Sequence, residues 1–244
     1  MDGLCRKSAF LTSIFEEVTL TGSTNADLLA RTVQGAPEGL WLRADAQDGG
    51  RGRLGRIWES PSGNLFASTI VRLRDTDPSP ASLAFVTAVA VFDAVRQMAP
   101  QVPICVKWPN DIFVGTQKLG GILIEQQIQG STIAWSVVGC GINVNAAPVL
   151  SNACSMFELT KVRFQPKTVL KEFLDLYNGQ IQLLYGDFQE LRTAFEAELF
   201  GKDTMQEFID AQQQAWPAKI IGVDDQGKLL LEKNAVVHAY DLQE

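Results

Sequence analysis

The chain has 244 residues, of which 46% are hydrophobic and 20% are charged, and its formal net charge at pH 7 is -7. This composition is typical of a globular protein with room for one large domain and one small one. The acidic balance disfavours nonspecific binding to nucleic acid. Because His238 is the one histidine, catalytic triads and metal sites that depend on histidine are excluded.

The amino-terminal stretch and the cysteines indicate a cytoplasmic protein. Residues 1–12 lack the apolar run of a signal peptide, and no apolar run in the chain approaches bilayer-spanning length. The four cysteines lie far apart and show no C-x-x-C spacing, which favours reduced thiols over disulfides or a zinc site. We therefore expect no membrane partner.

The first hundred residues predict strands that alternate with helices. The expected strands are 14–20, 40–46 and 65–73, and the expected helices are 26–33 and 81–98. Thr24 and Asp27 have the spacing of a capping box at the start of the first helix. The second helix is apolar on nearly every face, so we expect it to be buried.

Beyond residue 100 the sequence predicts short strands, then helices, then a small β module. The expected elements are strands over 103–107, 112–114, 120–125 and 132–140, helices over 151–159 and 167–200 with a break near 185–187, and a final hairpin of 216–223 and 228–232. Segments 120–125 and 132–140 should be antiparallel neighbours. The change of pattern after Gly201 predicts two domains, 1–202 and 203–244.

Residues 49–56 are the most unusual segment, with four glycines and three arginines in eight positions. Glycine lets backbone N–H groups approach a ligand closely, and guanidinium groups offer forked donors to phosphate or carboxylate. The pattern G-x-G-x-x-G occurs here, but the strand-like residues 65–71 follow it where a dinucleotide-binding turn needs a helix. Alone, such a run is more often an exposed loop between strands.

Two further stretches carry compatible chemistry. Residues 107–111 (K-W-P-N-D) place Asn110 and Asp111, oxygen donors suited to Mg²⁺ or a ribose, at a strand end. Residues 139–145 (G-C-G-I-N-V-N) combine close-approach glycines with amide side chains. Each stretch alone is equally compatible with a structural role, as an Asx turn in a hairpin or as a bulged strand end.

Together these stretches resemble the biotin protein ligase family, in the family's order, over residues 14–145. The matching motifs are 23–25 (S-T-N), Gln47 with 50–56 (G-R-G-R-L-G-R) and Trp58, then 107–111, 118–125 (K-L-G-G-I-L-I-E) and 139–143 (G-C-G-I-N). The resemblance implies an α+β fold: a mixed or antiparallel β-sheet with helices on one side, as in the class II synthetase-like ligases, followed by a small SH3-like β-barrel. Because the first motif starts at Ser23, we expect the short form without a DNA-binding domain.

The resemblance also implies an activity and a set of site residues. The activity is ATP-dependent activation of biotin to biotinyl-5'-AMP, with Mg²⁺, and transfer of biotin to a lysine of a biotin carboxyl carrier protein. The implied catalytic residues are Lys118, Arg51, Arg53 and Asp111, with Asp111 also as metal ligand. The implied biotin contacts are Ser23, Thr24, Asn25, Gln47, Gly50, Arg51, Gly52, Arg53, Lys118, Gly139 and Gly141. The implied nucleotide contacts are Arg53, Arg56, Trp58, Lys107, Asn110, Asp111 and Asn143.

Several alternatives stay open at this point. A lipoate–protein ligase would share the fold and chemistry, although the arginine-dense loop favours biotin. A noncatalytic sensor of biotin or nucleotide is a second alternative, which the presence of Lys118 and all three arginines disfavours. The tail departs from the family pattern, since residues 238–242 lack the glycine and glutamate usual before the last strand. Monomer and homodimer are both compatible with the sequence, and no DNA partner is expected.

Overall fold

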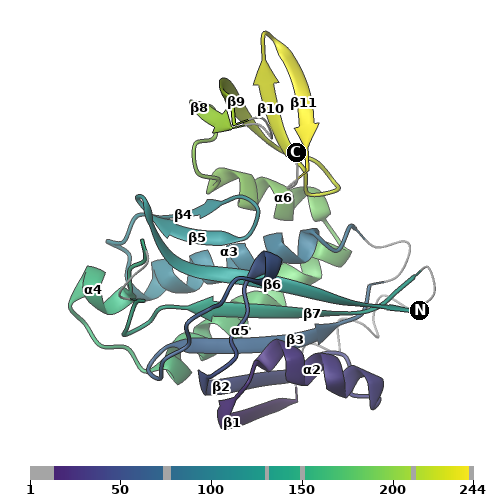
Figure 1. The fold of residues 1–244 in the computed structure, drawn as a ribbon, viewed down its shortest axis with the longest axis vertical. Helices are drawn as coiled ribbons and strands as arrows, with labels where there is room; N and C mark the ends of the chain where they lie inside the picture. The colour runs from purple at the N-terminus through teal and green to yellow at the C-terminus, as the bar shows by residue number, and fades with distance from the viewer. Residues whose placement is uncertain (1–13, 74–77, 130–131, 149–151, 210–212, 242–244) are drawn as a thin grey trace.

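The computed structural model describes residues 14–73, 78–129, 132–148, 152–209 and 213–241 (Figure 1). The larger sheet contains β1 (Phe15–Thr21), β2 (Trp41–Gln47), β3 (Leu65–Val71), β4 (Ile104–Lys107), β5 (Asp111–Val114), β6 (Gln117–Gln129) and β7 (Thr132–Ile142). The helices are α2 (Thr24–Val33), α3 (Ser82–Met98), α4 (Met156–Thr160), α5 (Pro166–Tyr185) and α6 (Phe188–Ala197), with a 3-10 turn η1 (Arg53–Gly55). The smaller sheet contains β8 (Met205–Ile209), β9 (Ala215–Val223), β10 (Leu229–Lys233) and β11 (Val236–Tyr240).

The larger sheet is mixed, with the order β1-β2-β3-β7-β6-β5-β4. β1 and β2 are parallel and are joined through α2, whereas the other neighbouring strands run antiparallel. The expected antiparallel pairing of β6 with β7 is confirmed. In the central register Gly139 of β7 lies between Ser68 of β3 and Leu123 of β6, so these three positions form one row across the sheet.

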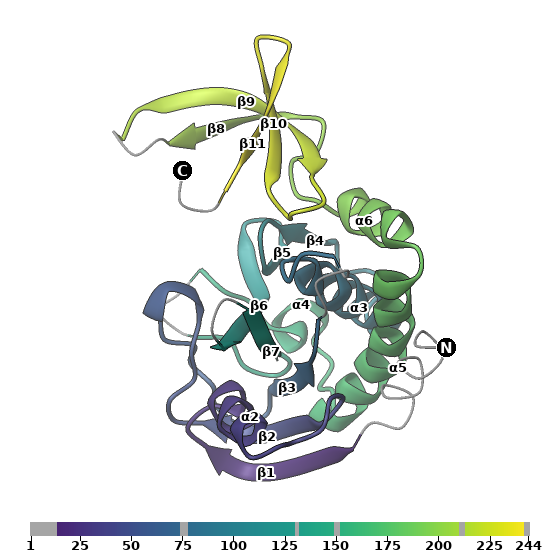
Figure 2. The same ribbon diagram turned by 90° about the vertical axis from the view of Figure 1, so that its right-hand side faces the viewer.

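Helices cover both faces of this sheet (Figure 2). α3 and α5 lie on one face, where Trp41 makes edge contacts with Phe173 and Tyr177 at ring-centroid distances of 5.7 and 5.0 Å. α2 packs on the opposite face, where Leu28 belongs to a second cluster with Val137 of β7. The expected mixed sheet with helices is confirmed, but the expectation of helices on one side is wrong, because the α2 face of the sheet carries its own apolar cluster, on which Leu28 packs.

The carboxyl-terminal module is a four-stranded antiparallel sheet of order β11-β10-β9-β8, consistent with a small SH3-like module. Its β9–β10 turn contacts the larger sheet, because Trp108 Nε1 donates to Gly227 O at 2.9 Å. Glu196 of α6 also accepts from the backbone N of Val223 at 3.0 Å. The domain boundary expected after residue 202 falls between α6 and β8 and stays a prediction.

Several local predictions need correction. The cap of α2 is Ser23, whose Oγ accepts from Ala26 N, because its backbone is extended while the Thr24 side chain is buried in the sheet. The helix expected over 151–159 is the shorter α4, which begins after a capping box of Ser155 and Glu158; residue 151 lies outside the described residues. The sequence analysis missed β8 and β11. Within the described ranges, no helix is long and apolar enough to cross a membrane.

Candidate active site

A cavity of about 150 Å³ lies on the sheet face that carries α2. It is bounded by the amino terminus of α2, the loop between β2 and β3, and the strands β3, β6 and β7. The predicted site residues that line it are Ser23, Thr24, Asn25, Gln47, Arg51, Gly52, Arg53, Arg56, Trp58, Asn110, Asp111, Lys118, Gly139 and Gly141. The fold thus brings together motifs that are more than a hundred residues apart in sequence.

Glycines form the floor of the cavity because side chains already occupy the space above them. A Cβ on Gly139 would lie 2.1 Å from Asn25 Oδ1, and one on Gly141 would lie 2.7 Å from Trp58 Nε1. On the adjacent strand, a Cβ on Gly121 would lie 3.2 Å from the Trp58 ring. The period of two along β7 places both of its glycines on this face, while Cys140 between them is buried in the core of the other face.

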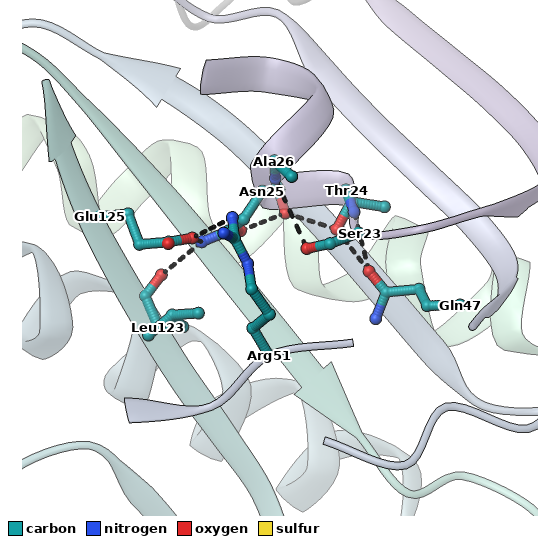
Figure 3. A network of polar contacts seen from close by, with 9 residues as sticks. Ser23, Thr24, Asn25, Ala26, Gln47, Arg51, Leu123 and Glu125 are labelled. Carbon is teal, nitrogen blue, oxygen red and sulfur yellow. Dashed lines mark hydrogen bonds and ion pairs between the residues drawn. The ribbon is translucent and has the colours of Figure 1, made fainter. Parts of the chain in front are cut away.

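One end of the cavity is a hydrogen-bond network of buried, neutral side chains that ends at the carboxylate of Glu125 (Figure 3). Asn25 Nδ2 donates to Leu123 O at 3.2 Å and to Glu125 Oε2 at 2.9 Å. Gln47 Oε1 accepts from Thr24 N at 2.8 Å. Ser68 connects the two halves, since its Oγ lies 2.6 Å from Asn25 Oδ1 and 2.7 Å from Thr24 Oγ1.

The direction of these hydrogen bonds is determined by the amide of Asn25. Its nitrogen faces two acceptors, so its oxygen must face Ser68 and accept the hydrogen of the Ser68 hydroxyl. Thr24 Oγ1 is then the donor to Ser68 Oγ at 2.7 Å, so its one hydrogen is not free for Gln47 Oε1, which lies 3.2 Å away. Because both amide hydrogens of Asn25 are used within the protein, this side chain can offer a ligand an acceptor and no donor.

The other end of the cavity is cationic and more open. Lys118 Nζ lies 2.7 Å from Asp111 Oδ1 and 5.1 Å from the centroid of the Trp58 ring. Arg53 Nη1 lies 3.5 Å from Asn110 Oδ1. Burial lowers the pKa of the Arg53 guanidinium from its ordinary value, although Asp111 and Asp241 oppose the shift, and arginine stays charged at neutral pH. This end can therefore bind an anion once that anion displaces the carboxylate.

The loop that carries the arginines is folded into a narrow hairpin. Trp58 N donates to Gly50 O at 2.9 Å, and Gly52 N donates to Arg56 O at 2.7 Å. The tip bends back at Leu54, which has a φ of 55°, and the following glycine has a φ of 72°. Leu54 and Ile57 are 72% and 85% exposed, so apolar side chains stand at the rim of the cavity.

Three predicted site residues do not line the cavity. Gly50 packs against the backbone of its own hairpin, where a Cβ would lie 2.3 Å from Trp58 O. Lys107 is exposed, and its Nζ lies 5.0 Å from the Phe113 ring centroid. Asn143 is buried, and its Nδ2 donates to Cys154 O at 3.1 Å. The predicted ligand contacts of these three residues therefore stay predictions.

The sequence analysis missed two polar residues of the site. Ser68 is fully buried, and its position in an apolar strand segment gave a signal that a polar group there needs a partner. Glu125 ends the fourth motif, and the structure places its carboxylate between Asn25 and Arg51. The sequence analysis also missed the apolar part of the cavity lining. These remaining lining residues are Ile57, Phe66, Gly121, Ile122, Leu123 and Cys140.

The thiol of Cys140 is poorly suited to nucleophilic chemistry. Burial raises its pKa to about 12, so the thiol is neutral at physiological pH. In the part of the chain that the structure describes, no three His, Cys, Asp or Glu side chains are grouped to hold a metal ion. Asp111 and Asn110 do fit Mg²⁺ in its usual protein setting, where one or two side-chain oxygens are completed by water and phosphate oxygens.

A second cavity of about 270 Å³ adjoins the cationic end and shares Arg53, Asn110 and Ile122 with the first. Its other lining residues are Pro80, Ala81, Ala84, Phe85, Pro109, Ile124, Gln126 and Gly227. Apolar side chains and polar atoms both face this space, and Gly227 comes from the β9–β10 turn of the carboxyl-terminal module. The space is therefore suited to a flat ring with polar edges joined to an anion at the cationic end.

The fold and the two cavities define the class of protein. It is a mixed α+β protein whose site fits a small ligand with one neutral, hydrogen-bonding end and one anionic end. Residues 18–143 match the model of the biotin/lipoate A/B protein ligase family. A biotin--[acetyl-CoA-carboxylase] ligase of Paracoccus denitrificans is 32% identical over 86% of this chain and 91% of its own. One of Mycobacterium tuberculosis is 32% identical over 92% of this chain and 86% of its own.

Among solved structures, a biotin protein ligase of Aquifex aeolicus has a similar fold, with a TM-score of 0.79 and 23% identity over 93% of this chain and 95% of that one. The chain belongs to the biotin/lipoate A/B protein ligase family.

Proposed function

We propose that the protein is an ATP-dependent biotin–protein ligase. It activates biotin to biotinyl-5'-AMP and transfers the biotinyl group to a specific lysine of a biotin carboxyl carrier protein. The observation that carries the proposal is the single cavity in which a neutral hydrogen-bonding end meets Lys118 and the arginine loop. Its curated relatives are named as biotin ligases, and the structure from Aquifex aeolicus is described as a complex with biotin and ATP.

The neutral end suits the ureido ring of biotin. A urea has two N–H donors and one carbonyl acceptor, and the cavity presents the acceptor oxygen of Asn25 beside the hydroxyl and amide groups of Ser23 and Gln47. The dithiolane ring of lipoate offers no comparable hydrogen bonds. A lipoate ligase would therefore leave the polar groups of this buried end without ligand partners, at a cost in affinity.

The cationic end suits the carboxylate of biotin and the α-phosphate of ATP. Bringing these two anions together requires positive charge, which Lys118, Arg51, Arg53 and Arg56 supply around the cavity. Trp58 provides an aromatic surface beside them, and the adjoining second cavity would hold the adenine ring. When bound, Mg²⁺ would neutralise phosphate charge, and Asp111 with Asn110 would hold it.

In the first step, an oxygen of the biotin carboxylate attacks the α-phosphorus of ATP. A P–O bond forms to biotin, the bond between the α- and β-phosphates breaks, and pyrophosphate leaves. Lys118 would contact the non-bridging oxygens, where negative charge grows in the transition state. To do so its ammonium group must leave Asp111, which lies 2.7 Å away before ligand binds.

In the second step, the acceptor lysine attacks the activated acyl carbon as a neutral amine. The C–N bond forms, the bond from the acyl carbon to the AMP oxygen breaks, and AMP leaves. The acyl-adenylate needs no strong base, so positioning of the amine is the main requirement. Asp111 can take the proton of the amine if Lys118 has moved to the phosphate.

Biotin-dependent exchange of labelled pyrophosphate into ATP tests the proposal directly. We expect exchange with biotin and much slower exchange with lipoate in its place. Binding of biotin without any exchange would identify a noncatalytic sensor instead. Faster exchange with lipoate than with biotin would show that the substrate assignment is wrong.

A further inference from the structure

Glu125 connects the buried end of the cavity to the arginine loop. It lies on β6 two residues after Leu123, which lines the cavity, and its own side chain is 25% exposed just outside that lining. One carboxylate oxygen, Oε2, accepts from Asn25 Nδ2 at 2.9 Å and from Arg51 Nη2 at 3.1 Å (Figure 3). A single charged atom thus contacts both the amide beneath the ligand space and a guanidinium from the loop beside it.

The first contact determines which way the amide of Asn25 points. With Glu125 and Leu123 O both accepting, a flipped amide would place its oxygen against a carboxylate and a carbonyl, which is repulsive. The amide nitrogen therefore stays on this side, and the oxygen faces Ser68 and the cavity. A neutral hydrogen-bond acceptor at position 125 would be sufficient for this contact.

The second contact needs the charge of Glu125. Arg51 is 43% exposed in its side chain, and its ion pair with Glu125 links the loop to β6 across the rim of the cavity. An anionic ligand competes with the carboxylate for the same guanidinium, so the pair can be exchanged on binding. A neutral side chain at position 125 would leave Arg51 without this link when no ligand is bound.

We propose that Glu125 is a positioning residue that orients the Asn25 amide for the ligand and holds Arg51 at the cavity until an anion replaces the carboxylate. The inference deepens the proposed function and rests on it for the identity of the ligand. It assigns two separable tasks to one side chain, so variants that remove one task or both should behave differently.

The experiment compares Glu125→Gln, Glu125→Ala and the control Gln127→Ala. Gln127 lies two residues further along the same face of β6 and also contacts α2, by accepting from Thr32 Oγ1, whereas Glu125 contacts Asn25 and Arg51. Three measurements are made on proteins shown to be folded by thermal melting: trypsin cleavage within residues 51–56 without ligand, the Kd for biotin, and KM and kcat in pyrophosphate exchange.

We expect Glu125→Gln to be cleaved several-fold faster than wild type while its Kd for biotin stays within about threefold. Glu125→Ala should be cleaved equally fast and should bind biotin about tenfold more weakly, with KM raised more than kcat is lowered. Gln127→Ala should match wild type in all three measurements.

Two results would overturn the proposal: wild-type cleavage and affinity in both Glu125 variants, or an equal loss of biotin affinity in Gln127→Ala. Wild-type protein that binds no biotin would count against the proposed function instead. The cleavage comparison would still test the contact with Arg51, since it uses no ligand.

Discussion

The two ends of the cavity differ in how their polar groups are held. At the neutral end, Thr24, Asn25 and Ser68 are at most 4% exposed and bond to one another or to neighbouring strands. At the cationic end, Lys118 and Arg51 keep 30% and 43% of their side chains exposed and pair with carboxylates. Neutral groups can be buried when they are hydrogen-bonded, whereas charges retain water or a counter-ion.

This difference separates recognition from chemistry. The neutral end already has its orientation before a ligand arrives, because its hydrogen bonds are made within the protein, and it is suited to specificity. At the cationic end, ligand oxygens must replace the carboxylates of Asp111 and Glu125. The attraction of its cations for the ligand therefore acts only when the anions bind and react. The predictions below test the two ends separately, starting from the largest effect.

Removing Lys118 should cause the largest loss of activity, because water cannot replace a cation beside the phosphate once the ligand fills the site. We expect Lys118→Ala to lower biotin-dependent pyrophosphate exchange by about 10²–10³-fold. Transfer from presynthesised biotinyl-AMP to the acceptor should fall much less, since the α-phosphate is already joined to the acyl group. Both half-reactions are measured on protein whose fold is checked by circular dichroism.

Lys107→Ala is the matched control for this prediction. Lys107 lies outside the cavity over the Phe113 ring, so its removal should change exchange by no more than about twofold. Near wild-type exchange in a folded Lys118→Ala protein would show that the catalytic assignment of Lys118 is wrong. An equal loss in both variants would mean that the family resemblance locates the nucleotide better than the ligand-free geometry does.

At the neutral end, Gly139→Ala should disturb the preformed network. The new Cβ would lie 2.1 Å from Asn25 Oδ1, so the buried amide must move and lose its bond from Ser68. We expect biotin to bind at least about tenfold more weakly and the free energy of unfolding to fall by about 1–3 kcal/mol. Calorimetric titration and denaturant unfolding measure the two effects.

Gly179→Ala provides the opposite case in the same protein. Gly179 lies in α5 with no neighbouring atom within 4 Å of an added Cβ, so alanine should raise the free energy of unfolding by about 0.5–1 kcal/mol. Biotin affinity should stay unchanged. If Gly139→Ala also binds biotin like wild type, the neutral end is not the ligand contact that we infer.

The smallest expected effect concerns the arginine hairpin. Its glycines permit several conformations and its three arginines gain further anionic partners when ligand binds, so biotin and ATP together should slow trypsin cleavage after Arg51, Arg53 and Arg56 by several-fold. Gel electrophoresis after timed digestion measures this change. Equal cleavage rates with and without ligands would show that the hairpin has the same accessibility in both states.

The sequence alone determined most of the elements and the identity of most lining residues. The glycine and arginine run, the residues 107–111 and the glycines of β7 are local signals, because turns, close approaches and charge clusters require particular residue types at adjacent positions. Three predicted site residues, Gly50, Lys107 and Asn143, lie outside the cavity lining, and their ligand contacts stay predictions. A motif does not say which face of a strand each side chain occupies.

Only the tertiary structure decided how these residues meet. Register places Gly139 between Ser68 and Leu123, and that row fixes the amide of Asn25 and gives Glu125 its two partners. The position of α2 on the face opposite α3 and α5 likewise follows from packing. The two contacts of Glu125 join residues that are 74 and 100 positions apart. Strand register and side-chain burial determine such contacts, and sequence periodicity does not specify them.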